Sequence, residues 1–255
     1  MNRFTKAIVR LPGPSMVNGL TSANLGRPDY KLALRQHEAY REALRACGLE
    51  VICLDADDEH PDSTFVEDVA LLTPHCAVIT RPGAPSRWGE TASIEPVIRE
   101  LFSVVDRVEA PGTVDGGDIL MTGDHYFIGL SERTNAEGAR QLIRILESHG
   151  LSGSTVPLAD VLHLKSAVAC IDDDLLVVGE ALAGRAEFSS FKCICVDREE
   201  SYAANCLWLN GTVLVADGYP KTKMAIESRR NQTIILDVSE FRKLDGGLSC
   251  LSLRF

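Results

Sequence analysis

Hydrophobic and polar positions recur along the chain in one order: an apolar strand, a polar loop, an amphipathic helix and a second strand. In the first unit, residues 4–10 predict a strand, residues 11–29 a loop rich in Gly, Pro, Ser and Asn, and residues 50–54 a returning strand. A helix is predicted at about 29–47, where side chains spaced three and four positions apart form one face. That face consists of Ala33, His37, Tyr40, Leu44 and Cys47, and Gly48 follows as a stop signal.

The third unit carries a second kind of helix signal. Residues 125–129 predict a strand, and Thr134 and Glu137 then have the spacing of a capping box. In that motif the hydroxyl and the carboxylate bind backbone N–H groups that have no partner within the helix. The helix that follows is predicted to end at Gly150.

Similar units begin near Cys76, Asp174 and Trp208, with further helices predicted at about 91–102 and 221–230. Five such units favour a closed, pseudo-symmetric α/β array, in which the loops at one end converge on the axis. An open α/β sheet with one or two extra strands would give the same count, so the pattern alone leaves both folds open. No linker or low-complexity segment interrupts the chain, and we expect residues 1–255 to form a single domain.

Composition and charge narrow the classes of function. Of the 255 residues, 45% are hydrophobic and 24% charged, which is an ordinary globular balance. No apolar run approaches the roughly 18 residues that would predict a membrane span, and the first residues lack the apolar core of a signal peptide. We therefore expect a cytoplasmic location. The net charge of −10 argues against nucleic acids and membranes as partners and weakly favours cationic ligands.

Eight cysteines are scattered over the chain, and most are expected to be reduced thiols. Cys53, Cys170, Cys193 and Cys195 have apolar sequence neighbours and are expected to be buried. No CxxC motif and no His/Cys group at zinc-finger spacing occurs, and the acidic run at 55–59 lacks the glycine of an EF-hand loop. The sequence therefore predicts no metal and no other cofactor.

Four segments concentrate polar residues within apolar surroundings. Two of them contain glycine pairs, which allow the backbone to approach a ligand closely. Together they supply His163, Cys250 and several carboxylates, the components of a thiol nucleophile with a base and an orienting acid. Residue types alone do not decide the matter, because an isolated cysteine is more often structural. The segments are residues 61–68, 112–118, 162–165 and 245–250.

The motifs FVED, GTVDGGDIL, HLKS and DGGLSCLSLRF, in this order and in a chain of this length, resemble the dimethylarginine dimethylaminohydrolase family of the guanidino-group-modifying superfamily. The resemblance spans essentially the whole chain and includes VNGLTS, ITRPG, SERTNAEGARQ and SYAANCLWLN. It implies a five-bladed α/β propeller with ββαβ-type repeats. The implied reaction hydrolyses asymmetric dimethylarginine or monomethylarginine to citrulline and the amine through a Cys-linked thiouronium. A homodimer is a further expectation from the family.

The resemblance also implies roles for individual residues. Cys250 is expected to be the nucleophile and His163 the general acid and then the general base. Asp115 is expected to orient His163; some bacterial relatives carry Glu at this position. Glu67 and Asp68 would hold the guanidinium, while Arg87 and Arg133 would hold the α-carboxylate. Asp62 and the backbone near Leu20 would take the α-amino group, and Phe65 and Ser249 complete the expected site.

Guanidinium chemistry explains why such residues are needed. The carbon is a poor electrophile because its charge is spread over three nitrogens, so attack requires a thiolate. A bound guanidinium would itself favour the thiolate, as any neighbouring cation does. This hypothesis of substrate-assisted deprotonation predicts a higher Cys250 pKa in the free enzyme than in the complex.

Two other functions stay open from the sequence. An arginine deiminase or amidinotransferase would act on another guanidino compound. The deiminases are longer, however, and carry Asp where Lys165 stands here, which favours methylated substrates. Val69 follows Asp68 where relatives commonly have Pro. A non-enzymatic binding protein with the same fold is disfavoured, because Cys250, His163 and Asp115 are all present.

Overall fold

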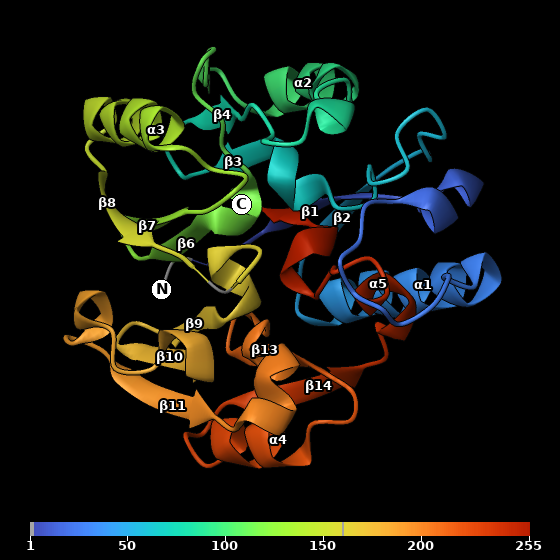
Figure 1. The fold of residues 1–255 in the computed structure, drawn as a ribbon, viewed down its shortest axis with the longest axis vertical. Coiled ribbons are helices and arrows are strands. Elements are labelled where there is room, and N and C mark those ends of the chain that lie inside the picture. The colour runs from blue at the N-terminus through green and yellow to red at the C-terminus, as the bar shows by residue number, and fades with distance from the viewer. Residues whose placement is uncertain (1–2, 160) are drawn as a thin grey trace.

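The computed structural model describes residues 3–159 and 161–255, in which five separate sheets each contain three strands. In every sheet the middle strand pairs antiparallel with one neighbour and parallel with the other. This fivefold repetition confirms a pseudo-symmetric α/β fold (Figure 1). Within the described part of the chain, strand pairing does not continue from one sheet to the next, so the alternative of one open sheet is wrong.

The strands follow one another around the molecule in chain order, except that the last strand returns to the first sheet. There β15 pairs with β1, so that both ends of the chain build one sheet. The sheets are β15 (Leu253–Arg254), β1 (Lys6–Arg10) and β2 (Glu50–Leu54); β3 (Ala70–Leu72), β4 (Ala77–Ile79) and β5 (Val105–Arg107); β6 (Ile119–Thr122), β7 (His125–Leu130) and β8 (Ser152–Pro157); β9 (Val168–Asp172), β10 (Leu175–Gly179) and β11 (Lys192–Val196); and β12 (Leu207–Leu209), β13 (Thr212–Ala216) and β14 (Gln232–Leu236).

In each sheet, the strand that pairs antiparallel with the middle strand lies on the inner side. These inner strands contact their counterparts in neighbouring sheets: β6 contacts β9, β9 contacts β12, and β15 contacts β3. The helices lie farther out, against the sheets (Figure 1). The loops next to the inner strands are therefore brought to one region, as the sequence predicts for such an array. The helices are α1 (Tyr30–Ala46), α2 (Glu90–Leu101), α3 (Ala136–Ser148), α4 (Pro220–Glu227) and α5 (Ser239–Arg242).

Helix α1 matches its prediction in position and in face. The Asp29 side chain caps it by accepting a hydrogen bond from the Leu32 amide at 3.1 Å. Gly48 has a φ of +85° just beyond its end, a conformation that glycine adopts without steric cost. Of the predicted face, only Cys47 is not fully buried. The buried members are Ala33, His37, Tyr40 and Leu44.

The predicted capping box at Thr134 is wrong. The cap of α3 is Asn135, whose side chain accepts from the Gly138 amide at 2.8 Å. The Thr134 hydroxyl instead accepts from the Asp115 amide at 3.1 Å, so it fixes the loop that carries Asp115 rather than the helix.

The fourth unit differs from the repeating pattern, because two 3₁₀ turns occupy the place of the α-helix that the pattern predicts. These are Glu180–Leu182 and Ala186–Phe188.

The expected burial of cysteines holds for Cys170 and is wrong for Cys53, Cys193 and Cys195, which are exposed. Successive strand residues point to opposite faces, and in β11 the two cysteines take the outward positions around buried Ile194. All eight thiols are free. No helix in residues 3–159 and 161–255 combines the length and the apolar character needed to cross a bilayer.

Candidate active site

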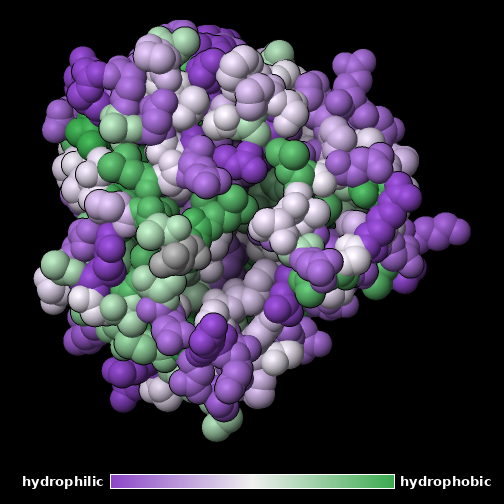
Figure 2. Space-filling model, in the orientation of Figure 1, coloured by the Kyte–Doolittle hydropathy of each residue, from purple (hydrophilic) through white to green (hydrophobic). Residues whose placement is uncertain are grey.

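A cavity of about 450 Å³ opens near the centre of one face, where the inner loops converge (Figure 2). Nine of the eleven predicted site residues line it, although they come from segments far apart in the sequence. Its remaining lining includes apolar side chains such as Leu158, Leu162 and Leu244. The nine predicted residues are Leu20, Asp62, Phe65, Asp68, Arg87, Asp115, Arg133, His163 and Cys250.

The backbone around Cys250 is fixed by close contacts. A 3₁₀ turn spans Ser249–Leu251, and the Gly247 amide donates to the Cys250 Sγ at 3.4 Å. A Cβ on Gly246 would overlap the ring of Phe65, and one on Gly247 would lie 2.5 Å from Asn205 Oδ1. Only glycines fit in this turn without displacing those side chains.

Asn205 is a residue that sequence reasoning missed. Its Oδ1 accepts from the Ser249 amide at 3.0 Å, and its Nδ2 donates to the Lys165 carbonyl at 2.8 Å. It thereby joins the segment that carries Cys250 to the segment that carries His163. The only sequence signal was its place within the quoted motif SYAANCLWLN.

His163 and Asp115 form a buried pair. His163 Nε2 and Asp115 Oδ2 lie 3.0 Å apart, and the other Asp115 oxygen accepts from the Gly83 amide at 2.7 Å. On the opposite side of the ring, a Cβ on Gly117 would lie 2.6 Å from His163 Nδ1. The imidazole is therefore held between a carboxylate and a glycine backbone, which fixes its orientation.

Asp68 is the central carboxylate of the cavity. It accepts from Arg87 at 2.5 Å and from the Gly117 amide at 2.8 Å. Burial opposes its charged form, but His163 and Arg87 outweigh burial and lower the pKa of Asp68. Glu90, which was not predicted, binds Arg87 through two bonds of 2.9 and 2.7 Å. Asp68 is therefore ionised and faces the cavity as an anion.

The charges around His163 and Cys250 favour an imidazolium beside a neutral thiol. Burial lowers the pKa of His163, but Asp68, Asp115 and Asp118 outweigh it and raise that pKa to about 9. Burial, then the charges of Glu67 and Asp68, raise the pKa of the Cys250 thiol to about 12, although Lys165 acts in the opposite direction. At neutral pH both shifts favour a protonated His163 and a Cys250 thiol.

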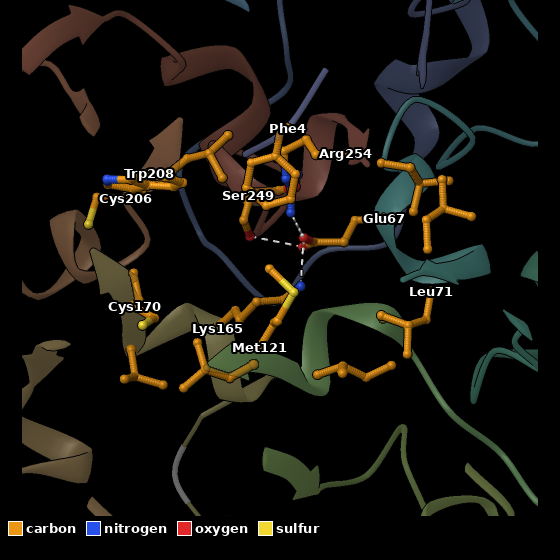
Figure 3. Close-up of a pocket in the computed structure, with 18 of the residues that line it drawn as sticks. Phe4, Glu67, Leu71, Met121, Lys165, Cys170, Cys206, Trp208, Ser249 and Arg254 are labelled. Carbon is orange, nitrogen blue, oxygen red and sulfur yellow. Dashed lines mark hydrogen bonds and ion pairs between the residues drawn. The ribbon is translucent and has the colours of Figure 1, made fainter. Parts of the chain in front are cut away.

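Glu67 lies outside this cavity, next to a second and smaller one of about 110 Å³. Its carboxylate meets Lys165 Nζ at 2.6 Å, Arg254 at 2.8 Å and the Ser249 hydroxyl at 2.9 Å (Figure 3). Ser249 and Lys165 line the second cavity as well. Of the expected acidic pair, only Asp68 is therefore placed to meet a ligand in the larger cavity.

The mouth of the larger cavity carries opposite charges. Asp62 accepts from the Leu20 amide at 2.9 Å, and Arg133 is close enough to lower the Asp62 pKa, although burial dominates and raises it. Leu20 itself is 41% exposed. The loop that carries it is tied down, because the Thr21 hydroxyl donates to the Lys243 carbonyl at 2.8 Å. One acid and one base at the mouth suit a ligand that ends in an α-amino acid group.

Three donor atoms in the cavity have the spacing of a metal site, because those of Asp68, Asp115 and His163 lie within 4.8 Å of one another. Each is already engaged, however: Asp68 by Arg87 and Gly117, and Asp115 by His163 and Gly83. A metal here would also face the Arg87 cation. The arrangement suits proton transfer and the binding of an organic cation.

Known proteins with similar sequences and structures support this interpretation. The family model described as arginine deiminase matches residues 58–252. An N(G),N(G)-dimethylarginine dimethylaminohydrolase of Pseudomonas aeruginosa is 52% identical over 253 residues, which cover 99% of this chain and all of that protein.

Two solved structures are nearly superimposable on this fold. One is DDAH from Pseudomonas aeruginosa, a cysteine-to-serine mutant complexed with citrulline; it has a TM-score of 0.99 and 51% identity and covers both chains fully. The other is a histidine-to-glycine dimethylarginine dimethylaminohydrolase adduct with S-methyl-L-thiocitrulline. Its TM-score is 0.98 at 51% identity, covering 99% of this chain and 100% of that one.

Proposed function

The chain belongs to the dimethylarginine dimethylaminohydrolase family, and from that premise we propose that it hydrolyses Nω-methylated arginine to citrulline and methylamine or dimethylamine. One observation carries the proposal: Cys250, the His163–Asp115 pair and the Asp68 anion line one cavity. The citrulline complex of the Pseudomonas aeruginosa structure and the S-methyl-L-thiocitrulline adduct of the second structure are consistent with this chemistry.

We assign the first half of the reaction to Asp68, Cys250 and His163. Asp68 binds the cationic guanidinium and places its carbon beside Cys250. The added positive charge lowers the Cys250 pKa, so the thiol releases its proton to solvent. The Sγ–C bond forms, the C–N bond to the methylated nitrogen breaks, and the imidazolium of His163 gives its proton to the departing amine.

The second half regenerates the enzyme. The Cys-linked thiouronium remains, and His163 is now neutral. It takes a proton from a water molecule, whose oxygen attacks the thiouronium carbon. The Sγ–C bond breaks, the proton of the added hydroxyl passes to Sγ, and citrulline leaves, while His163 is again protonated and held in orientation by Asp115. A pKa raised to about 9 suits the acid step at neutral pH.

The charged mouth of the cavity would hold the amino acid end of the substrate. Asp62 and the backbone at Leu20 are assigned to the α-amino group, and Arg133 to the α-carboxylate. Among the described residues, the Arg133 guanidinium has no hydrogen-bonded partner, whereas most donors of Arg87 are occupied by Glu90, Asp68 and backbone carbonyls. Arg87 therefore contributes mainly by fixing Asp68 and by its charge.

Glu67 and Ser249 act from behind the nucleophile in this proposal. Glu67 balances Lys165 and Arg254, and the Ser249 hydroxyl bridges Glu67 and Asn205. Lys165, which stands where deiminases carry an acid, is paired with Glu67 outside the larger cavity. The apolar lining from Phe65, Leu162 and Leu244 leaves room for methyl groups.

We further propose that residues 1–255 form one catalytic domain with a five-bladed α/β propeller arrangement, although residues 1, 2 and 160 lie outside the described structure. A cytoplasmic location, a small cationic guanidino substrate as the ligand, and a homodimer remain predictions from the sequence and the family.

A direct experiment separates this function from its competitor. The protein is incubated with asymmetric dimethylarginine, and citrulline and dimethylamine are measured, with plain arginine as the control. We expect dimethylamine from the methylated substrate and little ammonia from arginine. Preferential release of ammonia from arginine would instead establish a deiminase. Full turnover by Cys250→Ser would exclude covalent catalysis by this thiol.

A further inference from the structure

A second group of reactive side chains lies away from the larger cavity, between the second and third sheets. Cys76 immediately precedes β4, Asp106 lies on β5, and His149 ends α3. One donor atom of each, a sulfur, a carboxylate oxygen and an imidazole nitrogen, lies within 4.8 Å of the other two. None of the three residues lines the larger cavity or the smaller one behind it.

We propose that Cys76, Asp106 and His149 form a binding site for a zinc ion. Thiolate, imidazole and carboxylate are the ligands that Zn²⁺ takes, and three protein ligands leave the fourth tetrahedral position to water. Bond lengths of roughly 2.0–2.3 Å place tetrahedral donors about 3.3–3.6 Å apart. Because the three donors lie within 4.8 Å of one another, no pair has to close by more than about 1.5 Å to reach that spacing.

The surroundings of the site support a cation. His149 is the C-cap of α3, where the exposed carbonyls give the helix end partial negative charge. Thr73 fixes the backbone that carries Cys76, because its hydroxyl donates to the Cys76 carbonyl at 2.8 Å and accepts from the Cys76 amide at 2.9 Å. Asp106 and His149 keep 38% and 22% of their side-chain surface exposed, so an ion can enter from solvent.

A buried hydroxyl beside the site lacks a partner. Tyr126 Oη makes no hydrogen bond to any described residue, although the side chain is fully buried in the apolar cluster that contains Cys76. Unpaired buried hydroxyls are costly. Burial, and then the charge of Cys76, raise the Tyr126 pKa, so this hydroxyl lies near the thiol. Without an ion, the only polar bond that the site makes between its own members is the 2.8 Å contact of His149 Nε2 with Asp106 Oδ2.

Binding has a defined proton balance. Zn²⁺ replaces the Cys76 thiol proton, which passes to solvent. Burial raises the Cys76 pKa. A hydrogen bond with Thr73 opposes this effect, and the charge of Asp106 adds to it.

Cobalt substitution tests the site, because Co²⁺ bound to a thiolate absorbs light by charge transfer. The titration uses full-length Cys250→Ser protein, so that the thiol of the larger cavity cannot contribute. We expect one equivalent of Co²⁺ to give the thiolate band and Zn²⁺ to displace it. Adding Cys76→Ser should abolish the band, whereas adding Cys193→Ser, which removes an exposed thiol on β11, should leave it unchanged.

Two further variants keep the test decisive if Cys76→Ser does not fold. His149→Gln and Asp106→Asn change partly exposed residues, and each should weaken Zn²⁺ binding by at least about 100-fold, since even an outer-shell partner contributes roughly 10–100-fold. Zn²⁺ should raise the melting temperature of the Cys250→Ser protein, and His149→Gln should remove that increase. The proposal is overturned if the Co²⁺–thiolate band persists after Cys76→Ser is added to the Cys250→Ser protein. It is also overturned if the Cys250→Ser protein gives no such band.

Discussion

Glu67 and Asp68 are consecutive in the sequence, yet their carboxylates serve different cavities. Asp68 bonds Arg87 and the Gly117 amide and faces the larger cavity, while Glu67 bonds Lys165 and Arg254 beside the smaller one. Both lie in one short 3₁₀ turn, Val66–Val69, in which neighbouring side chains point in different directions. Of these adjacent carboxylates, Asp68 is therefore available to a ligand in the larger cavity, and Glu67 balances the cations beside the smaller one.

This division predicts the effect of Asp68→Asn. The substituted amide keeps the shape but loses the anion that meets the guanidinium, and a hydrogen bond to a charged group contributes about 1.5–3 kcal/mol. We expect kcat/KM for asymmetric dimethylarginine to fall roughly 10–100-fold. Steady-state kinetics measure this. Because Asp68 raises the pKa values of both His163 and Cys250, both should fall in the variant; unchanged values would contradict the assigned electrostatics.

Asp115 should act on the reaction through His163. Asp115→Asn can donate to the ring as well as accept, which favours the wrong tautomer, and general acid–base catalysis typically contributes about 10²–10⁴-fold. We expect kcat to fall within that range with little change in KM. Asp115→Glu is the matched control, since it keeps the carboxylate and should recover most of the activity. Equal losses in both variants would show that the site tolerates only the original side-chain length.

Ligand binding should lower the Cys250 pKa, which burial and the charges of Glu67 and Asp68 raise to about 12 in the free protein. A bound guanidinium compensates the charges of Glu67 and Asp68, which favour the thiol. The rate of alkylation by iodoacetamide, measured against pH, reports the thiolate fraction. A small guanidinium ion that leaves Sγ accessible should increase the rate at neutral pH, whereas a neutral urea should not. The same pH profile with and without the cation would refute substrate-assisted deprotonation.

His163 should make stability depend on pH. Its pKa is raised from 6.5 to about 9 in the folded protein, so its contribution is fully present below about pH 6.5 and is lost as the pH rises through about 9. The shift corresponds to roughly 3 kcal/mol. Urea unfolding at pH 6.5 and 9 should therefore show a larger loss of stability in the wild type than in His163→Gln. Equal losses would mean that His163 is not strongly coupled to its carboxylates.

The sequence by itself determined the features that depend on neighbouring residues or on long motifs. The spacing of Ala33, His37, Tyr40 and Leu44 placed α1 correctly, because helical periodicity is a local property. The five-unit pattern suggested the pseudo-symmetric arrangement but left an open sheet as an alternative, which the five separate sheets of the structure exclude. Motif order pointed to Cys250, His163 and Asp115, which do line one cavity.

Only the tertiary structure decided where each polar group found its partner. Thr134 has the sequence of a cap, but its hydroxyl is used by the Asp115 amide, a contact set by the packing of two loops. Glu67 and Asp68 are adjacent carboxylates that the sequence does not distinguish. In the fold Glu67 pairs with Lys165, whereas Asp68 pairs with Arg87. The group of Cys76, Asp106 and His149 has no sequence spacing that would reveal it. Such contacts join distant segments, and their energies depend on burial and distance, which local sequence does not specify.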